Sequence, residues 1–356
     1  MRELIKLVKE NWNIRFITDW KEIYSPEFQS QWLKWAENNV NSHVFFHPAL
    51  CMAWLETYRT IRKLEPLFCI VDSDHNHFFL PLVLWRKNWG NAFLKVIIPG
   101  GYSDLDYHEP YCIGNSDISE RGEVYKYIID EIEKRFTFDT FEINGILTEV
   151  TGNGWSKEEE VSPFCNLATY NNSEEYLQSL KVSLRGDIRR QIRRIEEIGK
   201  LQLVDFKDLP EALGILPSFL ELHSKRWPKA YKAPGFHENL LRYGLEKNIV
   251  HFTTLRVNDK TMSYHLGFRF NHTYYYYMPA IDPQFENLSP GKIHLFMLVD
   301  YAIKNEFYIF DHLRGDENYK SGWADALRPL YKFSLQSNRG ISKCKNRLLS
   351  LKKGFV

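Results

Sequence analysis

Two β-hairpin patterns that lie roughly half a chain apart constrain the fold of this sequence more than any other feature. Each consists of two β-rich runs around a turn that carries aspartate, at residues 67–85 and again at 251–270. Helical periodicities precede each hairpin, and one more β-rich run follows each, at 93–98 and at 273–278. Because the order helices, hairpin, strand occurs twice, we predict a duplicated α/β unit with two hydrophobic cores.

The segment 151–172 separates the two copies. It mixes glycine and proline with a Lys-Glu-Glu-Glu run, and its apolar periodicity is interrupted, as is typical of a connection between domains. We therefore place the boundary near residue 165 and predict domains at 1–165 and 166–356. A chain of 356 residues is long enough for two domains of roughly 150 to 200 residues each.

Composition argues against several classes of protein. The formal net charge of +1 disfavours attraction of the whole chain to nucleic acid or acidic membranes. The five cysteines lack the paired spacing of a zinc or redox site, so we expect reduced, mostly buried thiols. The longest apolar run, 78–85, is far shorter than the roughly 20 residues of a membrane span, and the first ten residues alternate charged with apolar side chains. We expect a cytoplasmic protein with no membrane insertion.

One predicted helix, 183–200, has an apolar stripe on one face and five arginines on the other. These are Arg185, Arg189, Arg190, Arg193 and Arg194. Such a face would suit a phosphate-bearing substrate, a nucleotide or RNA, or else it is a solvated surface, and both interpretations stay open. A later predicted helix, 213–227, places His223 and Arg226 near each other at positions i and i+3.

The stretch 273–323 contains more side chains able to bind a ligand or take part in catalysis than any other segment. Ser289-Pro-Gly-Lys292 directly precedes an amphipathic run, with serine suited to the N-cap and proline to the first helical position. Free amides around Gly291 to Ile293, together with the helix dipole, predict an anion site, although an ordinary capped helix is the alternative. The tyrosines of 274–277 alternate between two faces of the preceding strand, and Pro279 removes a ladder donor, which would open a groove.

A second polar cluster follows the predicted strand 307–311. Charged groups of both signs crowd its end, where a buried strand alone would rarely need them. They are Asp311, Arg314, Asp316, Glu317, Tyr319 and Lys320. We expect either an active centre or a salt-bridge network there, with Arg314 paired to Asp311. An acidic loop at 104–109 fixes no ligand geometry, so we assign no metal.

These motifs resemble the GNAT-type acyltransferases related to the bacterial CelD/BcsL cellulose-biosynthesis proteins. That family's pattern includes a Ser-Pro-Gly helix start and Asp-x-x-Arg-Gly-Asp-Glu-x-Tyr-Lys, present here as Ser289 to Gly291 and Asp311 to Lys320. The resemblance covers about residues 165 to 335 and extends to the first half only in outline. It implies an α/β (α+β) fold of two tandem GNAT-like domains, distantly FemABX-like, each a mixed, mostly antiparallel sheet flanked by helices.

The resemblance also implies acyl-CoA, such as acetyl-CoA, as co-substrate, although Ser-Pro-Gly replaces the usual GNAT pyrophosphate loop. We expect direct transfer of an acyl group, with no covalent enzyme intermediate, to an amine or hydroxyl of a small molecule or saccharide precursor. The sequence shows no recognisable Ser-His-Asp or Cys-His arrangement, so a nucleophilic hydrolase is a poor fit. The second domain is the predicted catalytic one, and the first is scaffold or binds the acceptor.

The predicted site divides by role. For the acyl donor we expect Tyr276, Met278, Ser289, Gly291, Lys292 and Ile293. For catalysis we expect Glu317 or Asp316 as base, His223 as a proton relay, and Tyr319 or Lys320 to orient the acceptor or protonate the leaving thiolate. For substrate binding we expect Arg185, Arg226, Asp311 and Arg314.

Two other functions fit the same motifs. One is a FemABX-like aminoacyltransferase that uses aminoacyl-tRNA, with the arginine-rich helix binding RNA phosphates. The other is a non-catalytic module in polysaccharide assembly.

Overall fold

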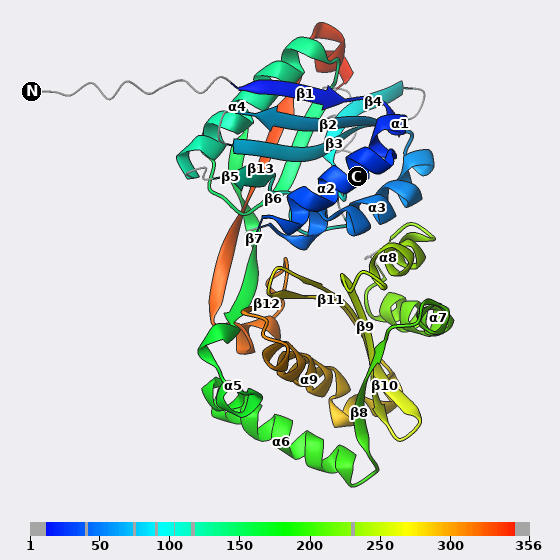
Figure 1. Ribbon diagram of the computed structural model, residues 1–356. Coiled ribbons are helices and arrows are strands. Elements are labelled where there is room, and N and C mark those ends of the chain that lie inside the picture. The colour runs from blue at the N-terminus through cyan, green and yellow to red at the C-terminus, as the bar shows by residue number, and fades with distance from the viewer. Residues whose placement is uncertain are drawn as a thin grey trace, which may run out of the picture. The chain divides into compact units, whose positions relative to one another are not determined.

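A computed structural model describes residues 12–39, 42–73, 76–89, 92–102, 104–114, 118–228 and 232–345 (Figure 1). The chain divides into two compact units. The first unit takes Met1–Ser42, Arg59–Ser156 and Tyr331–Val356, and the second takes His43–Tyr58 and Lys157–Leu330. These bounds differ from the predicted 1–165 and 166–356, because 43–58 packs with the second unit and 331–345 packs with the first.

The first unit is built on a sheet in the order β1-β2-β3-β4-β6-β13, with β5 beside β3. The strands are β1 (Asn13–Ile17), β2 (Leu64–Asp72), β3 (Asn76–Trp89), β4 (Ala92–Pro99), β5 (Tyr111–Gly114), β6 (Thr140–Ile146) and β13 (Ala326–Gln336). All pairs are antiparallel except β4 with β6. The helices are α1 (Trp20–Ile23), α2 (Pro26–Glu37) and α4 (Ile118–Arg135).

An aromatic core joins α2 to the first hairpin. The Trp32 ring lies 5.4 Å from that of Phe68 on β2 and 5.3 Å from that of Phe79 on β3, measured between centroids. The apolar positions of α2 recur with helical spacing and bury Phe28, Trp32 and Ala36. The predicted antiparallel hairpin is confirmed, since Phe68 lies opposite Pro81.

The second unit has a sheet in the order β7-β12-β11-β10-β9-β8. The strands are β7 (Trp155–Asn166), β8 (Leu201–Phe206), β9 (Val250–Val257), β10 (Lys260–Phe270), β11 (Thr273–Ile281) and β12 (Ile309–Asp311). The helices are α3 (Pro48–Ile61, mostly in this unit), α5 (Ser173–Ser179), α6 (Val182–Glu196), α7 (Leu209–Arg226), α8 (Phe236–Gly244) and α9 (Pro290–Lys304). In Figure 1, α7 and α8 lie on one side of strands β9 to β11, and α9 lies on the other.

Four short 3₁₀ turns occur in the described part of the chain: η1 (Val44–Phe46), η2 (Leu167–Thr169), η3 (Pro283–Leu288) and η4 (Lys320–Gly322). The predicted connection 151–172 is wrong in part, because it contains the strand β7. Among the described residues, no helix combines the length and apolar character that crossing a bilayer requires.

The two units repeat one order of elements. In the first it runs β1-α2-α3-β2-β3-β4-α4-β6, and in the second it runs β8-α7-α8-β9-β10-β11-α9-β12. The strand orders β1-β2-β3-β4-β6 and β8-β9-β10-β11-β12 also correspond, and in each unit only the last of these pairs is parallel. The predicted duplicated α/β architecture is therefore confirmed. One helix departs from it, since most of α3 packs with the second unit although it precedes β2 in the chain.

Candidate active site

The parallel strands β11 and β12 pair over only three residues. The ladder begins at Thr273 opposite Ile309 and ends at Tyr275 opposite Asp311. Beyond that point β11 continues to Ile281 paired with β10 on its other side. We call the β12-facing edge of residues 276–281 the open edge. Pro279 lies on it and lacks an N–H, so it offers no donor to a neighbouring strand. That a groove forms here stays a prediction.

A bulge opposite Gly267 sets the directions of the tyrosines on β11. The register shifts there, between the pair of Leu266 with Met278 and the pair of Phe268 with Tyr275. A Cβ on Gly267 would lie 2.6 Å from the Tyr275 carbonyl oxygen, so only glycine permits this approach. Tyr274 and Tyr276 pack into the core beside α9, whereas Tyr275 contacts Phe45 and Tyr277 contacts Phe268. The predicted division of these tyrosines between two faces is confirmed.

Four side chains gather where β11 and β12 part, one from β11 (Tyr276) and three from the chain after β12 (His312, Tyr319 and Lys320). The ring of Tyr276 lies 6.1 Å from that of His312, which follows β12 directly. The Tyr319 phenol raises the pKa of Tyr276, second to burial, and the Lys320 ammonium lowers that of His312, again second to burial. His312 is fully buried with a pKa of about 3, and neither ring nitrogen has a hydrogen-bond partner among the described residues. A buried neutral imidazole without partners marks this opening as a candidate site.

The loop after β12 is tied down by Asp311. Its carboxylate accepts hydrogen bonds from the Ser162 hydroxyl (3.1 Å), the Leu313 amide (2.8 Å) and the Arg328 guanidinium (3.0 Å). The predicted pair of Asp311 with Arg314 is therefore wrong. The loop is strained, since buried Leu313 has φ +62°, a value that a branched side chain rarely adopts.

The other predicted groups of this loop bind one another or β7. Arg314 pairs with Glu158 and Glu160 of β7. The Lys320 ammonium is held by the Arg314 carbonyl and by the Glu317 carboxylate, both at 2.8 Å. Asp316, Glu317 and Tyr319 are exposed. The loop therefore holds Lys320 in place from two sides.

The predicted anion site at the start of α9 is not formed as expected. Ser289 adopts φ +50°, and its side chain makes no cap hydrogen bond. The amides of Lys292 and Ile293 donate to the Ser289 carbonyl, at 3.0 and 3.3 Å, so two of the three expected amides are engaged.

Side chains fill the same corner. The Lys292 ammonium pairs with Asp187 of α6, and the Ile293 side chain is fully buried. A Cβ on Gly291 would lie 2.6 Å from Ile281 Cδ1, so this glycine allows close packing of α9 on β11. The Ser-Pro-Gly sequence thus joins strand to helix and does not expose a row of free amides.

His223 comes from α7 and touches the open edge. Its Nδ1–H donates to the Pro279 carbonyl at 3.1 Å, which leaves Nε2 as the nitrogen with a lone pair. Desolvation lowers the pKa of His223, the hydrogen bond to Pro279 opposes that shift, and the Lys232 ammonium adds to it. His223 is therefore a neutral imidazole whose ring orientation is set by its hydrogen bond to the Pro279 carbonyl. Its predicted neighbour Arg226 lies three residues further along the same helix, with its guanidinium carbon 5.9 Å from the centroid of the Trp227 ring.

His223 also lines a cleft of about 350 Å³ between the end of α7 and the start of α8. Met278 reaches the same region from β11, where its sulfur accepts a hydrogen bond from His237 Nε2 at 3.3 Å. Desolvation, followed by the Lys232 charge, lowers the pKa of His237 to about 3. The cleft was not predicted, because its walls come from segments whose periodicity indicates only helices.

The arginine-rich face of α6 is engaged within the second unit. Arg185 donates to the Gln178 carbonyl, and Arg194 donates to the Asn287 carbonyl. Arg189 pairs with Glu174, and Arg190 pairs with Asp187. These contacts favour a structural role for four of the five arginines, and RNA binding by this face stays a prediction.

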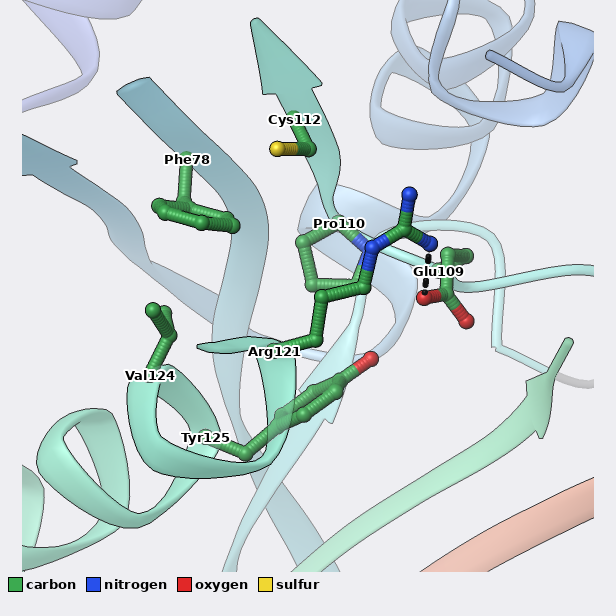
Figure 2. Close-up of a pocket in the computed structure, with 7 residues that line it drawn as sticks. All are labelled: Phe78, Glu109, Pro110, Cys112, Arg121, Val124 and Tyr125. Carbon is green, nitrogen blue, oxygen red and sulfur yellow. Dashed lines mark hydrogen bonds and ion pairs between the residues drawn. The ribbon is translucent and has the colours of Figure 1, made fainter. Parts of the chain in front are cut away.

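The acidic loop of the first unit has a structural role as well. Glu109 accepts hydrogen bonds from Arg121 (3.0 Å) and from the amides of Leu147 (2.9 Å) and Thr148 (3.1 Å). Figure 2 shows this ion pair above Tyr125 of α4, at a cavity of about 10 Å³, which has room for a single water molecule. No group of three potential metal ligands occurs in the described part of the chain.

Comparisons with known proteins agree with this architecture. Residues 182–321 match the family model described as Acetyltransferase (GNAT) domain. A comparison with curated protein sequences gave no match.

Solved structures are similar over nearly the whole chain. The crystal structure of FemX has a TM-score of 0.60 at 12% identity, covering 91% of this chain and 97% of that one. The C-terminal domain of a putative lysylphosphatidylglycerol synthetase from Agrobacterium fabrum has a TM-score of 0.56 at 9% identity, covering 91% and 97%. A tandem GNAT protein from the clavulanic acid biosynthesis pathway has a TM-score of 0.51 at 8% identity, covering 92% and 99%.

At such identities the likeness shows the fold alone. None of these comparisons names the CelD/BcsL group, so that finer resemblance stays a prediction. The chain shares the fold of tandem GNAT proteins, and residues 182–321 of its second unit match the GNAT acetyltransferase family model.

Proposed function

We propose that the protein transfers an acyl group from acyl-CoA directly to an amine, and that the reaction takes place in the opening between β11 and β12. The observation that carries this proposal is the early end of the β11–β12 ladder at Tyr275 opposite Asp311. It leaves strand edge beside Tyr276, His312 and Tyr319, which supports binding of an extended ligand next to groups able to move protons.

The open edge suits the arm of an acyl-CoA. An extended chain that contains amides can add to a free strand edge by main-chain hydrogen bonds, as peptides do in β-augmentation. Tyr276 and Met278 then lie on the strand that holds the arm, as predicted. The amides of Lys292 and Ile293 are engaged in the first turn of α9, so we do not assign the pyrophosphate to them.

His223 is the group best suited to act as the base. It is neutral, and its Nε2 carries a lone pair because Nδ1 donates to Pro279. Glu317, a predicted base, is paired with Lys320 and exposed, and Asp316 is exposed as well. In the proposed step the amine nitrogen bonds to the thioester carbonyl carbon, the carbon–sulfur bond breaks, and the proton lost by nitrogen passes to His223 Nε2.

Tyr319 is the proposed hydrogen-bond donor to the leaving sulfur. Although the residue is 42% exposed, burial of the rest of its ring, followed by the Glu317 charge, raises the pKa of its phenol, so the group keeps its proton at neutral pH. A thiol has an ordinary pKa of about 8.5, below that of the phenol, so the phenol stabilises the thiolate by a hydrogen bond while the carbon–sulfur bond breaks, and the thiolate leaves with its charge or takes a proton from solvent. The imidazolium then returns its proton to solvent.

Turnover and binding test this proposal. We expect acetyl-CoA or a longer acyl-CoA to raise the melting temperature and to release thiol when an amine is present. Tyr319→Phe should lower kcat by about 10- to 100-fold and leave acyl-CoA affinity unchanged, since loss of one hydrogen-bond donor to a developing charge costs this much or more. Tyr308→Phe is the matched control, because Tyr308 is also an exposed tyrosine but stacks on His272. If no acyl-CoA from acetyl to palmitoyl binds at saturating concentration, the proposal fails.

A further inference from the structure

We infer that residues 337–356 dock the protein onto an anionic lipid surface. This interaction goes beyond the proposed acyl transfer, since no residue assigned to the donor, the base or the opening takes part in it. We call residues 337–356 the basic segment. Three of its properties support the docking role: its charge, the spacing of its apolar residues, and the contacts that hold its start against the first unit.

The net charge of the whole chain hides a strong asymmetry. The chain has 46 basic and 45 acidic residues, and the basic segment contains six of the basic residues and none of the acidic ones. The six are Arg339, Lys343, Lys345, Arg347, Lys352 and Lys353. Residues 1–336 therefore have 40 basic and 45 acidic side chains, which is a formal net charge of −5. A segment of charge +6 on a net acidic protein favours binding to a polyanion.

The apolar residues of the basic segment recur with the spacing of one helix face. They follow one another at intervals of three and four residues, as Ile341, Cys344, Leu348, Leu351 and Phe355. At 100° per residue, cations border this stripe on both sides, with Lys345 and Lys352 on one and Arg347 on the other. Long basic side chains in such positions place their charges among lipid headgroups while the apolar stripe enters the interface.

The start of the basic segment already has this arrangement. A helix begins at Gly340 and is described as far as Lys345. The Asp139 carboxylate holds its inner side, where it accepts a hydrogen bond from the Ser342 hydroxyl at 2.6 Å and pairs with the Lys345 ammonium at 3.1 Å.

The apolar stripe lies on the other side of this helix. Ile341 is 75% exposed, the highest value among the large apolar side chains of the described residues, and Cys344 is exposed as well. The first two members of the stripe are therefore not packed on the first unit. An exposed branched apolar side chain between cations is costly in water and favourable at a lipid interface.

A lipid surface fits the basic segment better than RNA does. RNA would neutralise the cations, but it would leave the regularly spaced leucine and phenylalanine side chains in water. A lipid surface with anionic headgroups takes up both the charge and the stripe. Such binding is peripheral, in keeping with the finding that no described helix could cross a bilayer.

Vesicle sedimentation tests the inference with the full chain. We would compare vesicles of the zwitterionic lipid POPC with vesicles that also contain about 30% of the anionic lipid POPG, at about 0.1 M salt. We expect binding to the anionic vesicles to be tighter by about tenfold or more. Most of it should be lost at about 0.5 M salt, because salt screens the attraction. Equal binding to both kinds of vesicle would overturn the inference.

Two double variants separate charge from apolar contact. Lys352→Glu with Lys353→Glu should weaken binding to the anionic vesicles by about tenfold or more, since four units of charge change. Lys34→Glu with Lys260→Glu is the matched control, because both lysines are exposed elsewhere on the protein and the net charge changes equally. Leu351→Ala with Phe355→Ala should weaken binding by about fivefold or more at constant charge, since the stripe is lost.

The remaining outcomes would each overturn the docking role. Unchanged binding after charge reversal, or an equal loss in the control pair, would show that the basic segment is not the docking surface. Unchanged binding in the alanine pair, or binding of poly(U) RNA without binding of vesicles, would assign the charge to a nucleic acid partner instead. Melting temperatures recorded for every variant separate lost binding from lost folding.

Discussion

The parallel strands part early in both units, but the chain segment that follows takes a different route in each. In the first unit, β4 and β6 pair in parallel at Val96 opposite Thr140 and at Ile97 opposite Phe141. Beyond these pairs the chain's own segment 104–109 takes the place of a ligand along β6. The His108 amide donates to the Gly145 carbonyl at 3.0 Å, and its ring donates to the Asn144 carbonyl at 2.8 Å.

In the second unit the chain that leaves β11 turns away instead. It forms η3, which packs on α6 through a hydrogen bond from Arg194 to the Asn287 carbonyl. The edge of β11 is therefore not covered by the segment that follows it. The difference teaches that strand order alone does not make a site in this fold. In the first unit the loop after the fourth strand fills the opening with the chain itself, whereas in the second unit that loop leaves toward α6.

The largest expected effect is on catalysis in the second unit. In His223→Asn the amide nitrogen can still donate to the Pro279 carbonyl, while the lone pair of Nε2 is lost. We expect kcat/KM to fall by about 10²- to 10⁴-fold, the usual contribution of a general base. The acid limb of the pH profile of the unaltered enzyme should have its midpoint below pH 6.5, because the pKa of His223 is lowered and the base works only when neutral.

His77→Asn is the control for that variant. His77 lies in the first unit, is half exposed and pairs with Asp72, so its loss should leave the acid limb and the rate unchanged. Full activity of His223→Asn would show that the base lies elsewhere and that the contact with the open edge is structural.

The second-largest expected effect is on the stability of the first unit, where segment 104–109 fills the opening beside β6. Gly145 has φ +65°, and a Cβ there would overlap the carbonyl oxygen of Asp106. We expect Gly145→Ala to destabilise the first unit by roughly 3 kcal/mol, since backbone strain and an unavoidable clash add together. Chemical unfolding followed by tryptophan fluorescence measures this change.

Gly122→Ala, on α4, is the matched control because a Cβ there meets nothing within 4 Å. If the first unit is scaffold, the acyl transfer rate of the remaining folded Gly145→Ala protein should not change. A variant that is stable, or one that is folded but inactive, would contradict the view that segment 104–109 only fills the opening.

Features that depend on residues close together in the sequence could be predicted, and features that depend on distant residues could not. Both hairpins followed from β-rich runs around turn residues, because that pattern and the pairing lie within a few residues of each other. The long strands β7 and β13 were missed, because their partners are distant in sequence and β7 reads as a charged, irregular segment. His312 appeared in a polar motif, but its place beside Tyr276 depends on a parallel pairing that local pattern does not specify.

The predicted site was right about the region and wrong about several contacts. Asp311 was expected to pair with Arg314, three residues away, but it binds Arg328 of β13. Ser289 fits a helix cap by sequence. In the structure Gly291 packs against Ile281, and Ser289 has a left-handed backbone conformation in which the serine side chain makes no cap hydrogen bond. In both cases tertiary contacts outweighed a local rule that is worth only about 1 kcal/mol.

The smallest effect concerns stability against pH and tests whether buried histidines set the second unit apart. His294 is buried, lies within hydrogen-bond distance of the hydroxyls of Ser263 (2.9 Å) and Thr253 (3.0 Å), and has a pKa lowered by desolvation to about 3. Above pH 6.5 both folded and unfolded chains hold it neutral, so stability does not depend on pH. As the pH falls from 6.5 toward 3, only the unfolded chain takes up the proton, and stability falls by up to about 1.4 kcal/mol per pH unit for each such histidine. We expect His294→Gln to reduce the slope of unfolding free energy against pH between 6 and 4, whatever its effect at neutral pH, whereas His77→Gln in the first unit should leave the slope unchanged. An equal slope in both variants would mean that burial of His294 does not contribute to the loss of stability in acid.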